Sequence, residues 1–174
     1  MKNFSWKIKN NSSTSLARNG ILSTPHGVVQ TPAFIFCATK AALKSISADY
    51  LYNINTQIIL SNTFHLMLQP GGKIIAKHGG IHNFMKWRGP MLTDSGGFQI
   101  FSLGYGSVAD EIKGRGQKIN RNNSLLKITE EGALFKSYID GSKQLLSPEK
   151  SISLQRQIGA DIILVLDECT PYHL

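Results

Sequence analysis

Four short apolar runs constrain the fold of this chain more than any other feature. They lie within residues 34–37, 57–60, 90–93 and 161–166. Continuous apolar runs of this length are typical of strands that are covered on both faces of a sheet. Because strands that alternate with helices form parallel sheets, the chain is predicted to be an α/β protein. Two architectures fit: the amino-terminal half of a (β/α)8 (TIM-type) barrel, and an open four-stranded α/β sheet.

Capping residues mark the helices between the first three runs. Ser47 is expected to cap a helix that extends to about residue 54, where Asn55 can adopt the left-handed conformation that ends it. Helical turns are expected over residues 63–78, with a break at Pro70-Gly71-Gly72.

A stronger helix signal precedes the fourth run. Ser147-Pro148-Glu149 combines a capping serine, a proline at the first helical position and an acidic residue in the first turn. The helix is expected to extend to residue 157 or 158 and to stop at Gly159.

Two further segments have the alternating pattern of antiparallel strands. Residues 4–29 alternate polar and apolar side chains around Asn19-Gly20, which predicts an antiparallel hairpin or meander there. Residues 127–139 predict an inserted hairpin with its turn near Glu130-Glu131-Gly132.

The charge balance indicates a polyanionic partner. Lysine and arginine outnumber acidic residues by 19 to 11, which gives a formal net charge of +8 and favours nucleic acid. A Gly/Asn-rich inserted loop over residues 104–126 concentrates the positive charge in and beside it, at Lys113, Arg115, Lys118, Arg121 and Lys127. This composition fits a solvated surface loop and also a contact with RNA.

Length and cysteine content limit the class of protein. The 174 residues are enough for one domain, and they contain no apolar run of about 18 residues that would predict a membrane span. The first residues lack the apolar stretch of a secretory signal, so we expect a cytoplasmic protein. Cys37 and Cys169 alone cannot form a disulfide scaffold or a four-ligand zinc site, and Cys37 is expected to be a small core residue.

Polar residues follow three of the four predicted strands. The clusters are Ser61-Asn62-Thr63, Asp94-Ser95-Gly96-Gly97 and Asp167-Glu168-Cys169. Because binding sites of α/β proteins form where the carboxyl ends of strands meet loops, three such clusters predict a common pocket.

Each carboxylate of this pocket also has a simpler interpretation. Asp94 can line a site that a ligand approaches closely over two glycines, with Phe98 as a face on which a base could stack; a tight turn with a core phenylalanine is the alternative. Asp167 can accept hydrogen bonds from the N–H groups of a guanine; a helix cap or a satisfied loop carboxylate is the alternative. The five histidines form no metal-binding motif, and we predict that none is a ligand: His26, His65, His78, His82 and His173.

Several motifs together resemble one family, the tRNA-guanine transglycosylases. Ser61-Asn-Thr-Phe-His-Leu resembles the family's NTYHL segment, and Gly79-Gly-Ile-His-Asn-Phe-Met-Lys-Trp87 resembles its GGLHKFMNW. The most diagnostic match is Thr93-Asp-Ser-Gly-Gly-Phe-Gln99. The remaining matches, in the family's order, are Ile128-Thr-Glu-Glu-Gly132, Ile139-Asp-Gly-Ser-Lys143, Leu146-Ser-Pro-Glu-Lys-Ser151 and Asp167-Glu-Cys-Thr-Pro-Tyr172.

The resemblance implies a fold, a reaction and partners. The fold is a (β/α)8 barrel with insertions, of which residues 1–174 would form a single partial domain, the amino-terminal half. The reaction is base exchange at the anticodon wobble position of GUN tRNAs, where guanine is replaced by a 7-deazaguanine in queuosine biosynthesis. An aspartate attacks the ribose anomeric carbon, guanine leaves, and the incoming base displaces the enzyme. Complete members of the family are often homodimers.

Residue roles carry over at the matching positions. Asp94 matches the general acid/base, and Ser95, Gly96, Gly97 and Phe98 match the base-binding segment in which the aromatic ring stacks on the base. Asp167 matches the carboxylate that reads the base edge, and Cys169 matches a cysteine of the same pocket. Asn62 is expected to orient its neighbours or the ribose.

The sequence departs from the family in two places. Phe36-Cys37-Ala38-Thr39 stands where the family usually has Pro-Val-Gly-Thr, and residues 104–126 are an insertion relative to many bacterial members. The attacking aspartate and the zinc ligands of the family are expected beyond Leu174, so we predict no metal or other cofactor in this chain and an inactive isolated chain. A non-catalytic tRNA-binding or partner-binding relative is the alternative. Cys169 favours 7-aminomethyl-7-deazaguanine over queuine as the incoming base.

Overall fold

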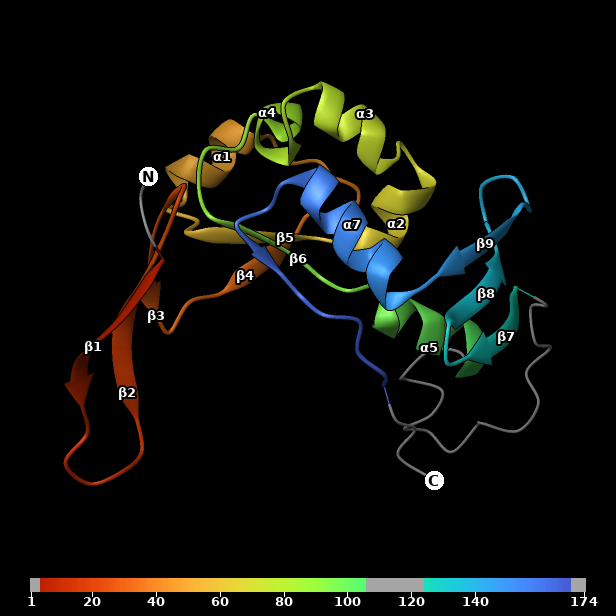
Figure 1. Cartoon of the computed structure of the whole chain (residues 1–174). Coiled ribbons are helices and arrows are strands. Elements are labelled where there is room, and N and C mark those ends of the chain that lie inside the picture. Colours follow the sequence, from red (N-terminus) through yellow and green to blue (C-terminus); the bar gives the residue numbers. More distant parts are fainter. Residues whose placement is uncertain (1–3, 106–123, 170–174) are drawn as a thin grey trace.

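The computed structural model describes residues 4–105 and 124–169 and has a central parallel sheet (Figure 1). Its four strands lie in the order β10-β6-β5-β4, so each strand pairs with the next parallel strand along the chain. Their bounds are β4 Ile35–Cys37, β5 Ile58–Ser61, β6 Met91–Thr93 and β10 Ile162–Ile163. The prediction of a parallel α/β sheet is therefore confirmed. Within the described residues the sheet is open at β4 and β10.

Helices cover one face of this sheet, as Figure 1 shows for α1, α3, α4 and α7. The six helices of the described residues are α1 Ala48–Asn53, α2 Thr63–Leu68, α3 Gly72–Lys77, α4 Ile81–Met85, α5 Gly97–Tyr105 and α7 Pro148–Ile158. The longest, α7, has 11 residues, and none in the described ranges is long and apolar enough to cross a membrane.

The main core lies between the sheet and the helices. Ile59 and Met91 are fully buried and pair across β5 and β6 on the helical face. Helix residues complete this core, among them Leu51, Leu66, Ile75, Ile81, Leu154 and Ile158. Because side chains alternate along a strand, the next pair, Leu60 and Leu92, faces the other side and packs in a second cluster with Val29 of β3.

The predicted caps are confirmed. The hydroxyl of Ser47 accepts a hydrogen bond from the Tyr50 N–H at 3.3 Å, and Asn55 has a φ of 55°. At α7, the hydroxyl of Ser147 accepts a hydrogen bond from the Lys150 N–H at 3.1 Å, and Gly159 ends the helix with a φ of 77°. Helices α4 and α5 were not predicted.

The amino-terminal segment is a three-stranded antiparallel meander, as predicted, but its turns lie elsewhere. The strands are β1 Ser5–Asn11, β2 Arg18–Thr24 and β3 Gly27–Thr31. Asn19-Gly20 lies inside β2, where Gly20 pairs with Ile8 and with Thr31. A Cβ atom on Gly20 would lie 2.6 Å from the Trp6 ring, so this glycine allows the tryptophan to pack closely on β2 and makes no turn.

The inserted hairpin is confirmed and has a third strand that was not predicted. Strands β7 Leu125–Thr129, β8 Gly132–Lys136 and β9 Lys143–Leu146 form an antiparallel sheet. The fully buried Phe135 packs this sheet against Phe64 and Ile100. Gly104 and residues 125–126 belong to α5 and β7, so they are not loop, and residues 106–123 of the predicted loop lie outside the described residues.

Burial at the two outer strands was predicted wrongly. Phe34, next to β4, is 74% exposed, and Cys37 is exposed and does not belong to the core. The run 161–166 forms only the two-residue strand β10, and Val165 is 74% exposed. An apolar run indicates a strand but does not distinguish an edge strand from a central strand. In this sheet β4 and β10 are the edge strands.

Candidate functional site

The loops that follow the strands are joined at the carboxyl edge of the sheet. Backbone hydrogen bonds run from Ala38 N to Leu60 O (2.6 Å), from Asn62 N to Thr39 O (3.3 Å) and from Asp94 N to Ser61 O (3.3 Å). The buried hydroxyl of Ser61 adds a bond of 2.8 Å to the carbonyl of Ala38. These hydrogen bonds hold the segments that follow β4, β5 and β6 in fixed positions relative to one another.

The carboxylate of Asp94 is held by three donors. The Thr63 N–H donates to Oδ1 at 2.7 Å, and the amide of Asn62 donates to Oδ2 at 2.6 Å. The amide of Gln99 in α5 donates to Oδ2 at 3.2 Å. Asp94 itself is half-buried, so its orientation is fixed while part of it reaches the surface.

Asn62 and Thr63 place this carboxylate. The hydroxyl of Thr63 donates to the carbonyl of Asp94 at 2.6 Å, in addition to the backbone bond to the carboxylate. Asn62 is buried, and its Oδ1 lies 3.6 Å from the Sγ of Cys37. Asn62 thus contacts Asp94, and its expected role in orienting its neighbours or the ribose stays a prediction. Thr63 was not singled out, although it stood in the same cluster as Asn62.

Ser95 links the segment that follows β6, which carries Asp94, to the segment that follows β10, which carries Asp167. Its buried hydroxyl donates to Oδ1 of Asp167 and accepts from the Gly97 N–H at 3.1 Å. A Cβ atom on Gly97 would lie 2.1 Å from the carbonyl oxygen of Asp167, so only glycine allows this approach of the two loops. Asp167 is exposed, and its Oδ2 lies 3.9 Å from the thiol of Cys169.

Phe98 is a surface residue at the start of α5. Its side chain is 48% exposed, with its ring centre 6.3 Å from that of Phe101. The alternative of a core phenylalanine in a tight turn is therefore wrong. Gly96, the residue two positions earlier, lies against the side chain of Leu146.

Two titratable groups near this edge have shifted pKa values. Burial raises the pKa of the Cys169 thiol, and the charge of Asp167 raises it further, so the thiol stays protonated at neutral pH. Burial lowers the pKa of His65, and the positive charge of Lys40 adds to this, against the opposing effect of Asp94. The Nδ1 of His65 lies 2.9 Å from the hydroxyl of Tyr138.

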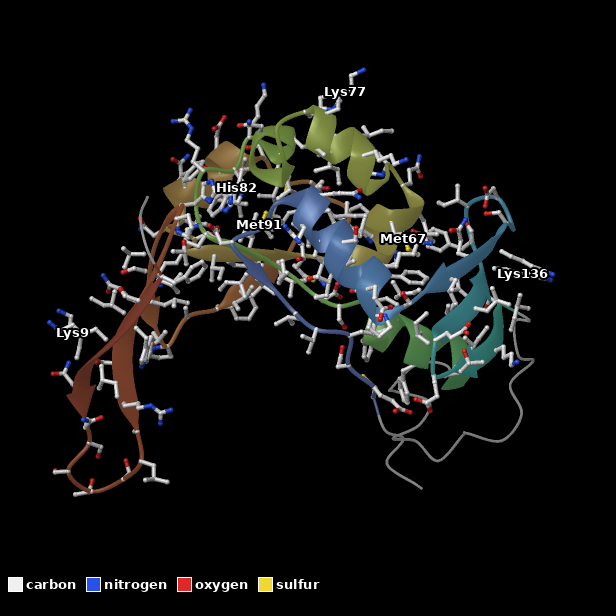
Figure 2. The ribbon with its side chains drawn as sticks, in the orientation of Figure 1. Lys9, Met67, Lys77, His82, Met91 and Lys136 are labelled. Atoms are coloured by element: carbon white, nitrogen blue, oxygen red, sulfur yellow. The ribbon has the colours of Figure 1, made fainter. Side chains whose placement is uncertain are left out.

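A second polar cluster lies near the start of β6 and was not predicted. Figure 2 shows His82 close to Met91, the first residue of that strand. The buried carboxylate of Asp161 accepts the Met91 N–H at 2.9 Å and lies 2.7 Å from Nδ1 of His26. The Nε2 of His82 lies 3.3 Å from Oδ2, but it makes no hydrogen bond there. His26 and Asp161 are 135 residues apart in sequence, so no spacing pattern could reveal their contact.

This cluster is also the group of residues in the described ranges that could best hold a metal ion. The rings of His26 and His82 are stacked, however, with centres 3.6 Å apart and planes 15° from parallel. A metal lies in the plane of each imidazole that binds it, and two nearly parallel planes do not share such a point. As placed, the two histidines and Asp161 form a stacked polar contact, and no metal role is assigned to them.

The structure thus brings together most of the residues that the sequence singled out. Direct contacts link Asn62 to Asp94 and, separately, Ser95 to Asp167. Asp94 and Ser95 are neighbours in the chain, so the two pairs are joined. Cys169 lies beside Asp167 in the second pair. The result is two fixed carboxylates and a half-exposed aromatic ring at one edge of a sheet, an arrangement suited to a flat, hydrogen-bonding ligand such as a purine base.

Comparison with known proteins agrees with this geometry. The family model described as Queuine tRNA-ribosyltransferase matches residues 12–174. A queuine tRNA-ribosyltransferase of Roseiflexus sp. (strain RS-1) is 53% identical over 159 residues, which are 91% of this chain and 40% of the relative. That of Protochlamydia amoebophila (strain UWE25) is 49% identical over 174 residues, all of this chain and 45% of the relative. The chain therefore spans less than half the length of these relatives.

Proposed function

Because the chain belongs to the queuine tRNA-ribosyltransferase family, we propose that its carboxyl-edge site binds the base that is exchanged in tRNA. The whole protein would replace guanine at the wobble position of GUN tRNAs with a 7-deazaguanine, as a step of queuosine biosynthesis. The observation that carries the proposal is the pair of fixed carboxylates, Asp94 and Asp167, together with the exposed ring of Phe98 four residues after Asp94. The net charge of +8 fits a tRNA partner.

Each residue then has a role that its contacts support. Asp94, oriented by Thr63 and Asn62, would take up and return the proton of the departing and arriving base. Phe98 would stack on the base, and Gly96 and Gly97 would let Leu146 and Asp167 approach the segment that carries this ring. Asp167, held by Ser95, would accept hydrogen bonds from the N–H groups of the guanine edge, and Cys169 would line the pocket as a neutral thiol.

We further propose that the sheet is the first half of a (β/α)8 barrel. The sequential parallel order of β4, β5, β6 and β10 supports this, because a barrel adds strands one after another, whereas the strand order of a doubly wound sheet reverses at one point. Exposed apolar residues in β4 and directly after β10, Ile35 at 40% and Leu164 at 45%, fit sheet edges that neighbouring strands would cover. The isolated chain should therefore be marginally stable or self-associate. A cooperative, monomeric unfolding transition at high temperature would argue against the half-barrel.

The function is tested by binding and by exchange. Guanine and adenine are titrated into the protein by calorimetry, and guanine is expected to bind at least about tenfold more tightly, because adenine lacks the adjacent N1–H and N2–H donors that can both bond to one carboxylate. Equal binding of the two bases would reject the proposed site.

The second measurement incubates the 174-residue chain with GUN tRNA and radiolabelled guanine. We expect no incorporation, because the attacking aspartate is expected outside these residues. Incorporation by the chain alone would contradict that expectation and assign the whole reaction to this segment. Binding of tRNA without selective guanine binding would favour the non-catalytic relative.

A further inference from the structure

A buried amide on α7 contacts the two strands that lead to the proposed base site. Gln155 is fully buried, and its Oε1 accepts hydrogen bonds from the Thr93 hydroxyl at 2.8 Å and from the Leu164 N–H at 3.0 Å. Its Nε2 donates to the Leu164 carbonyl at 2.7 Å and to the Ser151 hydroxyl at 3.0 Å. Both donors and both acceptor positions of the amide are therefore used.

At Leu164 the side chain of Gln155 replaces a strand partner. β10 pairs with β6 only at Ile162 and Ile163. One residue later, Gln155 satisfies both the N–H and the carbonyl of Leu164, as a neighbouring strand would. The segment that leads from Leu164 to Asp167 thus starts from a point that α7 fixes, three residues before the carboxylate.

The same network reaches the other carboxylate. Thr93, which donates to Gln155, is the residue before Asp94. Ser151, one helical turn before Gln155, donates through its hydroxyl to the carbonyl of Ser95 at 2.7 Å. Ser95 in turn donates to Asp167. The side chains of Thr93, Ser95, Ser151 and Gln155 are all buried, so the hydrogen bonds among them hold their geometry firmly.

We propose that Gln155 is a positioning residue that sets the spacing between Asp94 and Asp167, and with it the affinity of the site for a guanine-type base. The identity of the ligand in this proposal rests on the proposed function. The coupling of α7 to the segments that carry Asp94 and Asp167 does not rest on it. Gln155 would touch no substrate, because its side chain lies wholly beneath the loops.

The test compares three variants. Gln155→Met keeps the length of the side chain and removes all four hydrogen bonds. Thr93→Val removes a single bond to Gln155 at constant shape. Ile158→Ala, in the same helix and equally buried, removes apolar packing and no hydrogen bond of this network, so it is the matched control for loss of stability.

Two readouts are measured for each variant: the dissociation constant for guanine, and the rate of amide hydrogen exchange at Gly97 relative to Leu51. The Gly97 N–H reports on Ser95, to which it donates, and the Leu51 N–H lies in α1, outside the network. We expect Gln155→Met to weaken guanine binding about tenfold and to accelerate exchange at Gly97 about tenfold more than at Leu51. Thr93→Val should change both readouts in the same direction to a smaller extent. If Gln155→Met does not fold, the two readouts of Thr93→Val test the positioning role.

Ile158→Ala should accelerate both amides equally and leave guanine affinity within about twofold of the starting protein. If Gln155→Met and Thr93→Val also changed both amides equally and left guanine affinity unchanged, the positioning role would be overturned while guanine binding itself stood. If the unaltered protein did not bind guanine, the proposed function would fail, and the exchange rates would still decide whether Gln155 couples the two loops.

Discussion

The two polar clusters of this protein use aspartate in opposite ways. The side chain of Asp161 is buried, and the protein supplies its partners: the Met91 N–H and the ring of His26, with His82 close by. Asp167 is exposed, and Asp94 is half-buried on a frame of buried donors. A sheltered, satisfied carboxylate contributes to stability, whereas a fixed carboxylate that reaches the surface can still bind a ligand. The same substitution at Asp161 and Asp167 should separate the two uses.

The largest effect is expected at Asp161. Asp161→Asn keeps the shape of the side chain but removes the charge and leaves an amide facing His26 and His82. Because the side chain of Asp161 is fully buried, the free energy of unfolding should fall by about 3 kcal/mol, measured by urea denaturation. Guanine affinity should stay within about twofold. A loss of stability below about 0.5 kcal/mol would show that the cluster does not hold the fold together.

The dependence of the free energy of unfolding on acidic pH is a second test of the structural role of Asp161. Burial raises the pKa of Asp161, but the contacts with His82, His26 and the Met91 N–H outweigh it, so the pKa lies below its ordinary value. The unfolded value is about 3.9, so the resulting stability is present above about pH 4 and is lost as the pH falls through the lower, folded pKa.

Urea unfolding of the unaltered protein and of Asp161→Asn at several pH values measures this loss. The difference between them should narrow only below about pH 4. A difference that already narrows well above about pH 4 would show that the ionisation of Asp161 is not the cause.

Asp167 should behave in the reverse manner. In Asp167→Asn the Ser95 hydroxyl can still donate to the side-chain oxygen, and the residue is exposed, so the free energy of unfolding should change by less than about 0.5 kcal/mol. Guanine affinity, measured by calorimetry, should fall about tenfold, because an amide offers one acceptor where the carboxylate offers two. An unchanged affinity would remove Asp167 from base recognition.

The sequence allowed the carboxyl-edge site to be predicted for a geometric reason. Parallel strands that neighbour one another end at the same edge, so Asn62 and Asp94, which follow β5 and β6, had to come close. The link between Ser95 and Asp167 follows from the same rule, since β6 and β10 are also neighbours. Local capping chemistry, as at Ser147, was equally accessible because it depends on adjacent residues only.

Other features depend on contacts that no local pattern encodes. His26 and Asp161 meet only because the turn before β3 lies next to the start of β6 and β10, at the amino ends of these parallel strands. Gly20 was interpreted as a turn residue, whereas the nearby Trp6 is the reason for a glycine at that position. The exposure of Phe34 and Val165 reflects the position of their segments at the ends of the sheet, which the composition of an apolar run does not reveal.

The smallest effect concerns α7, the helix that carries Gln155 toward the proposed base site. Ser147→Ala removes the hydroxyl that accepts the Lys150 N–H, and it should lower the free energy of unfolding by about 1 kcal/mol in urea denaturation. Guanine affinity should be unchanged, because the cap lies two turns from Gln155 and none of that residue's four hydrogen bonds is lost. A fall in affinity that matched the fall in stability would mean that the site responds to the general stability of α7. An unchanged affinity, together with the loss expected for Gln155→Met, would locate the coupling between helix and site in that single amide.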